Sequence, residues 1–67
     1  MGIKTARITA GLSQETLAIK LQIDRSTVAK WETGKSLPRA EILPKIASIL
    51  NCTVDELLRG DGGEANG

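Results

Sequence analysis

The 67-residue chain contains no histidine and a single cysteine, Cys52. Without histidine it lacks the commonest general base and the commonest side-chain metal ligand. A lone cysteine excludes an intrachain disulfide and the paired-cysteine zinc and redox sites, and it suits a reducing compartment. We therefore expect no metal, no cofactor and no enzymatic activity, and we expect a cytoplasmic protein.

Aromatic residues are almost absent as well, since the chain has no phenylalanine, no tyrosine and one tryptophan, Trp31. No apolar run approaches the roughly 18 residues that a membrane-spanning helix requires, and residues 1–10 lack the apolar run of a signal peptide. We therefore expect no membrane partner. So short a chain has room for one small domain with a thin core, and such a domain rarely encloses a deep catalytic pocket.

A strong excess of charge of either sign is also missing, because nine basic and eight acidic residues leave a net charge of +1. The charges are nevertheless unevenly distributed. Residues 1–39 carry seven basic and three acidic side chains, whereas residues 40–67 carry two basic and five acidic ones. This asymmetry is typical of a protein in which one face meets a polyanion. An ordinary scatter of surface charges explains it equally well.

Apolar residues recur at helical spacing, and no segment alternates in the way that a strand does. The spacing predicts an all-α domain of five helices, at residues about 3–10, 14–21, 25–32, 41–50 and 54–59. Pro44 is tolerated only in the first turn of a helix, so the fourth helix is expected to begin near Ala40 or Glu41. We expect the domain to cover residues 1–60 and residues 61–67 to form a flexible tail.

Residues suited to helix capping support the same division. Ser13 and Asp24 can each accept a hydrogen bond from the free N–H groups at the start of the second and third helices. Thr53 and Glu56 have the spacing of a capping box, in which each side chain bonds the backbone N–H of the other residue. Gly60 can end the last helix in a left-handed conformation.

The second and third helices have the features of a helix-turn-helix. Each has about eight residues and only three residues join them, so they must meet at a tight bend, where the small Ala18 permits close approach. Val28 and Trp31 give the third helix an apolar side that can rest on the second. The opposite side has only short or cationic residues, namely Arg25, Ser26, Thr27, Ala29 and Lys30. A helix of this kind can lie in the major groove of DNA.

This region resembles the Cro/cI-type (XRE-family) helix-turn-helix domains of phage repressors and bacterial regulators, and the similarity extends from about Ile3 to Leu58. The motifs that carry it are Gly11-Leu12-Ser13-Gln14, Lys30-Trp31-Glu32-Thr33-Gly34-Lys35, Pro38 and Val54-Asp55-Glu56-Leu57-Leu58. The resemblance implies a compact five-helix, phage-repressor-like fold, usually a homodimer, with the third helix in the major groove of double-stranded DNA. The family often has glycine in the bend where this chain has Gln22, which would cost about 1 kcal/mol if that residue needs a positive φ.

The resemblance also implies which residues touch DNA. Arginine and lysine can donate to guanine and serine is adaptable, so base contacts are expected from Arg25, Ser26, Lys30 and Thr27. Phosphate contacts are expected from Gln14, Ser13, Thr33, Lys35, Ser36 and Arg39. The alternative for all of these positions is a solvated helix face or an ordinary polar loop.

Other residues are expected to support the fold or the assembly. By the same resemblance, Arg7 and Glu32 form a structural ion pair between the first helix and the end of the third, without contact to DNA. The dimer interface is expected to involve Val54, Leu57 and Leu58. These three cannot all fit in so small a core, so we expect some to finish the core and some to meet the partner. Trp31 is expected to pack at the core or its edge, and Cys52 to act as a small buried hydrophobic residue.

The sequence therefore predicts a sequence-specific double-stranded DNA-binding protein that regulates transcription, acting as a repressor by occupying its site. Within the same class, an antitoxin-type autorepressor remains an alternative. A protein–protein adaptor with the same fold, docking through Leu57, Leu58 and the acidic C-terminal half, is an alternative from another class. Binding to DNA at low salt that weakens steeply as salt rises would favour the regulators over the adaptor.

Overall fold

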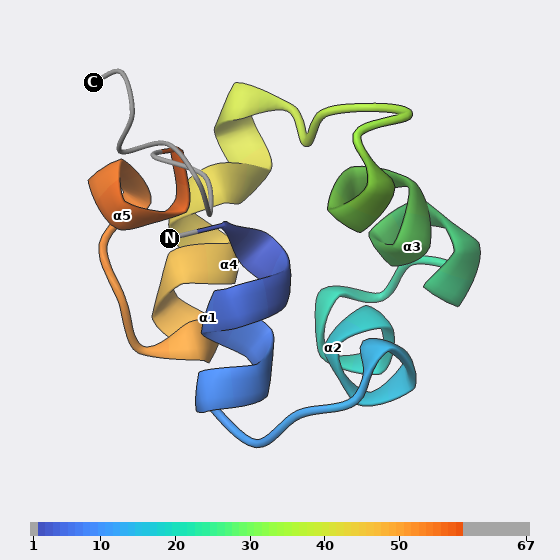
Figure 1. Cartoon of the computed structure of the whole chain (residues 1–67), viewed down its shortest axis with the longest axis horizontal. Helices are drawn as coiled ribbons and strands as arrows, with labels where there is room; N and C mark the ends of the chain where they lie inside the picture. The colour runs from blue at the N-terminus through green and yellow to red at the C-terminus, as the bar shows by residue number, and fades with distance from the viewer. Residues whose placement is uncertain (1, 59–67) are drawn as a thin grey trace.

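The computed structural model describes residues 2–58, and within that range the chain consists of helices and short connections without any strand (Figure 1). Its elements are α1 (Ile3–Thr9), α2 (Gln14–Leu21), α3 (Arg25–Thr33), the 3₁₀ helix η1 (Ala40–Ile42), α4 (Leu43–Leu50) and α5 (Val54–Leu58). The predicted all-α fold with five α-helices is confirmed. The expected ending at Gly60 and the expected tail at 61–67 lie outside the described residues, so the domain limit at residue 60 stays a prediction.

Three of the expected capping residues occupy the N-caps, but only two helices are capped by side chains. The hydroxyl of Ser13 accepts from the N–H of Thr16 at 3.0 Å at the start of α2. The capping box of α5 is present in both directions, with Thr53 N–H donating to Glu56 at 2.9 Å and Glu56 N–H donating to Thr53 at 3.0 Å. The prediction for Asp24 was wrong in one respect, because its carboxylate makes no capping hydrogen bond. Its backbone carbonyl accepts from the N–H of Thr27 at 3.0 Å, which satisfies a donor that the carboxylate would have bonded.

The fourth helix begins later than the sequence predicts. Residues Ala40–Ile42 form the 3₁₀ helix η1, and α4 starts at Leu43 with Pro44 in its first turn. A continuous α-helix from Ala40 would press the Pro44 ring against the Ala40 carbonyl and would leave that carbonyl without its N–H partner. The change from a 3₁₀ turn to an α-helix at residue 43 avoids both problems.

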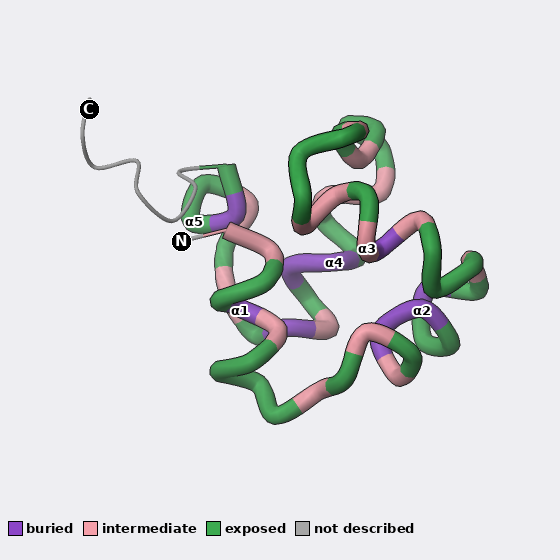
Figure 2. The backbone as a smooth tube through the Cα atoms, turned by 45° about the vertical axis from the view of Figure 1, so that its right-hand side comes forward, coloured by how far each residue is buried: buried purple, intermediate pink, exposed green. Residues whose placement is uncertain are grey.

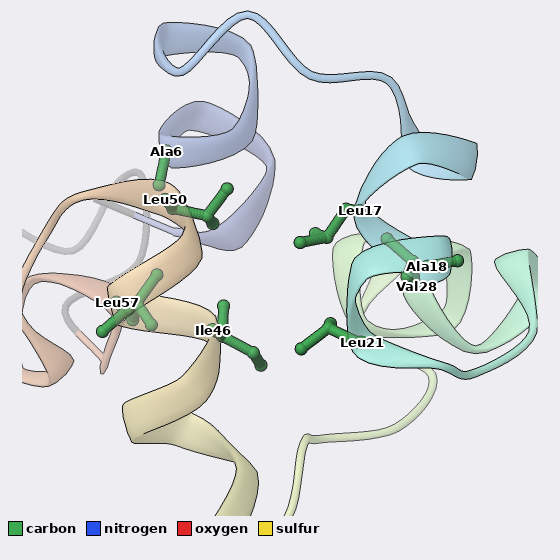
Figure 3. Packing of buried hydrophobic residues seen from close by; sticks show 9 residues of the cluster. Ala6, Leu17, Ala18, Leu21, Val28, Ile46, Leu50 and Leu57 are labelled. Atoms are coloured by element: carbon green, nitrogen blue, oxygen red, sulfur yellow. The ribbon is translucent and has the colours of Figure 1, made fainter.

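The hydrophobic core draws on every α-helix. Its buried residues are Ala6, Leu17, Ala18, Leu21, Val28, Ile46, Ala47, Leu50 and Leu57. Figure 2 shows these buried stretches facing the middle of the molecule, and in Figure 3 the side chains of α2 point toward those of α4. Trp31 is partly buried and packs against this core, as predicted. Cys52 packs against it too, but it is half-buried and not fully buried as the sequence predicts. Burial, together with the nearby Glu56 carboxylate, raises the pKa of the Cys52 thiol.

Leu57 and Leu58 separate clearly at the end of the described chain. Leu57 is 6% exposed and completes the core, whereas Leu58 is 65% exposed. The expectation that Leu57 belongs to a dimer interface therefore changes, because its side chain leaves almost no surface for a partner. Val54 is half-buried and packs against the core, and the rest of its side chain remains exposed to the expected dimer partner.

The bend between α2 and α3 places Gln22 at a positive φ, the condition under which a residue other than glycine is strained. Gln22 ends α2 in the left-handed region, with φ 63° and ψ 42°. The N–H of Ile23 donates to the Ala18 carbonyl at 3.0 Å, the long hydrogen bond that typically closes a helix ending of this kind. Without a glycine, the bend carries the steric cost of a Cβ atom in this region, about 1 kcal/mol.

An ion pair joins α1 to the end of α3. Arg7 Nε lies 2.6 Å from Glu32 Oε2, and Arg7 Nη2 donates to Glu32 Oε1 at 3.1 Å. Arg7 Nη1 also donates to the Leu12 carbonyl at 2.7 Å, so the same guanidinium holds the turn before α2. The structure thus contains the pair that the resemblance implies, with side chains that are 11% and 3% exposed.

The environment of Glu32 favours its ionised form. Burial by itself raises the pKa of this carboxyl, but the hydrogen bonds from Arg7 and Gln14 and the positive charges of Arg7 and Lys4 outweigh burial, so the pKa lies below its ordinary value of 4.5. The hydrogen bond and charge of Glu32 in turn raise the pKa of Arg7 above its ordinary value, against the opposing effect of burial.

We predict that replacing Gln22 with glycine stabilises the domain. Gln22→Gly removes the left-handed strain, a gain of about 1 kcal/mol that the greater entropy of the unfolded chain partly offsets. Lys20→Gly is the matched control, because Lys20 is exposed within α2 and glycine there should cost about 1 kcal/mol. Urea unfolding measures both, and equal destabilisation by the two variants would contradict the prediction.

We also predict that Glu32 makes stability depend on acid. Because its pKa is lowered in the folded state, its contribution is fully present above about the ordinary value of 4.5 and disappears as the pH falls through the lowered value. Glu32→Gln should lower the free energy of unfolding at pH 7 by about 3 kcal/mol, since Arg7 loses its partner. Urea unfolding from pH 7 to pH 3 should show the two proteins converging in acid, and parallel curves would count against this account.

Candidate nucleic-acid interface

Helix α3 rests on α2 by one side and leaves the other side open. Val28 is fully buried between the helices, while Arg25, Ser26 and Lys30 are exposed. Thr27 is half-buried at the margin of the exposed side. Three of the four residues expected to contact bases therefore lie on the surface and none of them is in the core, as a groove-reading helix requires.

A chain of hydrogen bonds connects this exposed side to the ion pair beneath it. Gln14, the first residue of α2, donates from Nε2 to Glu32 Oε1 at 3.0 Å. Its Oε1 accepts from Arg25 Nη1 at 3.3 Å. The side chains of Arg7, Glu32, Gln14 and Arg25 thus form one continuous network that spans three helices. The structure brings Gln14 and Arg25 together although they are predicted to touch different parts of DNA.

The start of α2 combines backbone and side-chain groups that suit an anion. The first N–H groups of a helix lack partners within the helix, and the helix dipole favours negative charge there. Gln14 keeps a second amide N–H beyond the one that Glu32 accepts. Ser13 is differently placed, since its hydroxyl is already bonded to Thr16 through both the backbone N–H and the side-chain oxygen.

The loop after α3 supplies the other expected phosphate contacts. Gly34, with φ 82°, ends α3 and turns the chain so that the N–H of Lys35 donates to the Lys30 carbonyl at 2.9 Å. In Figure 1 this loop lies on the far side of α3 from α2. Lys35 and Arg39 are exposed, and Ser36 is half-buried. The hydroxyl of Thr33, by contrast, donates back to the α3 carbonyls of Ala29 and Lys30 at 3.1 and 3.3 Å.

The electrostatics of this surface are more distinctive than the net charge. Between residues 25 and 39 the sequence has four cations and one carboxylate, that of Glu32. Because Arg7 pairs with that carboxylate, the cations have no neutralising partner within their own segment. The cations are Arg25, Lys30, Lys35 and Arg39, and all four are exposed. The surface formed by α3 and its following loop is therefore cationic, with the exposed carboxylates of Asp24 and Glu41 only at its two ends, and it fits a polyanion.

Two features of the site were not found in the sequence. The hydrogen bond between Gln14 and Glu32 joins residues that are 18 positions apart in the sequence, and no motif or spacing predicts it. Trp31 also lines a surface groove of about 470 Å³ beside α3, together with residues of the following loop and α4. Its core packing was predicted, but the groove depends on how the loop folds back, which sequence periodicity does not describe.

Among residues 2–58, no three or more histidine, cysteine or acidic side chains are grouped so that they could hold a metal ion. In the same part of the chain, no helix has the length and apolar character needed to cross a bilayer.

The chain is similar in sequence to known helix-turn-helix proteins. A family model described as Helix-turn-helix matches residues 3–57. The HTH-type transcriptional activator BcrR of Enterococcus faecalis is 39% identical over 59 residues, which cover 88% of this chain and 29% of that protein. The SPbeta prophage-derived HTH-type transcriptional regulator YonR of Bacillus subtilis is 38% identical over 58 residues, covering 87% of this chain and 54% of that protein.

An archaeal relative matches along most of its own length. This HTH-type transcriptional regulator of Archaeoglobus fulgidus is 34% identical over 62 residues, which cover 92% of this chain and 89% of that protein. The chain spans less than a third of BcrR and about half of YonR. No solved structure matches the chain significantly. The extent of the family match, together with the exposed, cationic third helix, shows that the chain belongs to the XRE-type helix-turn-helix family.

Proposed function

We propose that this chain binds double-stranded DNA with sequence specificity and represses transcription as a homodimer by occupying its site. The observation that carries the proposal is the position of α3, which buries Val28 against α2 and leaves Arg25, Ser26 and Lys30 exposed. A helix supported on one side and polar on the other can enter the major groove without uncovering the core.

Base recognition is assigned to the exposed side of α3. Arg25 and Lys30 can donate to the O6 and N7 atoms of guanine, and Ser26 can bond several bases. Thr27 is half-buried at the margin of this side, where it can add a methyl contact to thymine or a hydrogen bond to phosphate. The bond from Arg25 to Gln14 uses one of the five guanidinium N–H groups and leaves the others for a base.

Phosphate contacts are assigned to the two sides of α3. Gln14 and the start of α2 form one set of donors, and Lys35, Ser36 and Arg39 form the other. These contacts would fix the register of α3 in the groove without reading sequence. Ser13 and Thr33 belong to the same regions, but their hydroxyls bond within the chain, so a phosphate contact from either requires that bond to be exchanged.

The dimer is assigned to α5. Leu58 is exposed there, and the half-buried Val54 lies on the same helix. A two-fold pair would present two α3 helices to half-sites about 34 Å apart along the DNA. Occupancy of a promoter is sufficient for repression, and an antitoxin-type autorepressor would use the same mechanism. BcrR is named an activator, so its similarity does not favour repression over activation.

A protein–protein adaptor receives less support from the structure than the DNA-binding proposal. One of the two leucines expected to dock a partner, Leu57, is in the core. The adaptor also gives no role to the exposed cations that flank α3.

We predict that Arg25→Ala lowers specific affinity by about 1–3 kcal/mol and relaxes preference at one base pair. Lys20→Ala is the matched control, because Lys20 is an exposed cation at the opposite end of α2 from Gln14. It should have a small effect that is the same on all sequences. Binding titrations with the preferred duplex and its single-base variants measure both, and an equal loss for Arg25→Ala on every duplex would show that Arg25 touches phosphate instead.

We predict that Leu58→Glu shifts the protein from dimer to monomer, because two carboxylates would be buried against each other or against apolar surface. Ile19→Glu is the matched control, since Ile19 is 67% exposed on α2 and lies outside the proposed interface. Sedimentation equilibrium at matched concentrations gives the masses. If Leu58→Glu leaves the mass of a dimeric protein unchanged, Leu58 is not at the interface.

A further inference from the structure

The Gln14 amide lies between two groups of opposite hydrogen-bonding character. Its nitrogen is 3.0 Å from Glu32 Oε1, and its oxygen is 3.3 Å from Arg25 Nη1. An ionised carboxylate can only accept hydrogen bonds, and a guanidinium can only donate them. The amide therefore satisfies both neighbours when its nitrogen faces Glu32 and its oxygen faces Arg25. The reverse orientation would place the amide oxygen against the carboxylate and the amide N–H groups against the guanidinium.

Glu32 is held far more firmly than Arg25. The Glu32 side chain is 3% exposed, and both of its oxygens accept from Arg7. Arg7 is fixed in turn by its bond to the Leu12 carbonyl. Arg25 is exposed, and the bond to Gln14 is the only hydrogen bond that its side chain makes to another described residue. The firmly held Glu32 carboxylate can therefore fix the Gln14 amide, and the amide can in turn restrict the exposed Arg25 guanidinium.

A long, exposed arginine ordinarily samples many rotamers, and fixing them on binding costs conformational entropy. A partner that already accepts from the guanidinium reduces that cost and limits the directions in which the remaining N–H groups point. Bidentate readout of guanine needs such a direction, because both N–H groups must lie in the plane of the base.

We propose that Glu32 is a positioning residue for base recognition, because it fixes the orientation of the Gln14 amide and thereby aims the Arg25 guanidinium. The proposal rests on the proposed function, since it assigns Arg25 to a base. Its consequence is that a residue without DNA contact sets part of the discrimination between sequences. Loss of the carboxylate at position 32 should therefore reduce preference at the base pair that Arg25 reads, in addition to any effect on folding.

The test uses the full chain and a duplex selected by the wild-type protein from a random pool. The base pair read by Arg25 is the one at which Arg25→Ala loses preference. The measured quantity is the ratio of affinities for the selected duplex and for the same duplex changed at that base pair. Contacts to phosphate are the same on both duplexes, so a change in them cancels in the ratio.

Two variants interrupt the network at different bonds. Glu32→Gln replaces the carboxylate by an amide that can present either end, and Gln14→Leu removes both amide bonds while leaving Arg7 paired. Each should lower the ratio by about threefold or more, and neither should lower it further once Arg25→Ala is present, because residues in one network are not additive. If Glu32→Gln does not fold, Glu32→Asp replaces it, since the shorter side chain keeps a charge for Arg7 but withdraws from Gln14.

Ile46→Val is the control for stability alone. It removes a methyl group from the core at α4, away from the hydrogen-bond network, so it should lower the melting temperature and leave the ratio unchanged. The proposal is overturned if the folded Glu32 and Gln14 variants keep the wild-type ratio, or if they lower it equally in the Arg25→Ala background. If the wild type itself prefers no duplex over random DNA, the proposed function fails, which is a different result from either of these.

Discussion

The ion pair between Arg7 and Glu32 is the interaction on which the arrangement of the site depends. It joins α1 to the end of α3, and the third bond of Arg7 holds the turn before α2. Three segments that are distant in sequence are thereby fixed relative to each other in a domain whose core is small and entirely aliphatic. Buried ion pairs are a poor source of net stability, but they define geometry well when each partner is fully hydrogen-bonded. Here that geometry places the start of α2 beside the exposed side of α3.

Sequence reasoning was successful where one local rule controls the outcome. The hydrophobic spacing predicted the helices, and the Thr53–Glu56 spacing predicted the capping box. The strain at Gln22 was suggested by the family resemblance, because the family often has glycine at that position. It was less successful where local rules compete. A carbonyl rather than a carboxylate satisfies the start of α3, and Pro44 divides the predicted fourth helix because its ring excludes a continuous α-helical turn.

For the site, sequence and resemblance identified the residues but not their connections. The exposed positions of Arg25, Ser26 and Lys30 follow from helical periodicity once the apolar side of α3 is known. The division between Leu57 and Leu58 depends on how α5 packs against α4, and adjacent leucines are equivalent by composition. The bond between Gln14 and Glu32 requires three helices to be in place at once, so no local pattern contains it. A net charge of +1 likewise conceals a cationic surface, because the neutralising residues lie elsewhere in the chain.

The way α5 is held has a consequence for how the domain behaves below its melting point. The five residues of α5 that the structure describes are too few to form a stable helix in water by themselves, and they are held by the capping box and by packing of Val54 and Leu57 against the core. Such a segment can detach and re-dock as a local opening event, at a lower free energy than global unfolding. The helix-turn-helix unit, whose core contacts come mainly from α2, α3 and α4, can stay assembled while this happens. The surface of α5 is thus available to a partner only while α5 is docked on the core. A partner that binds this surface would increase the docked fraction of the protein.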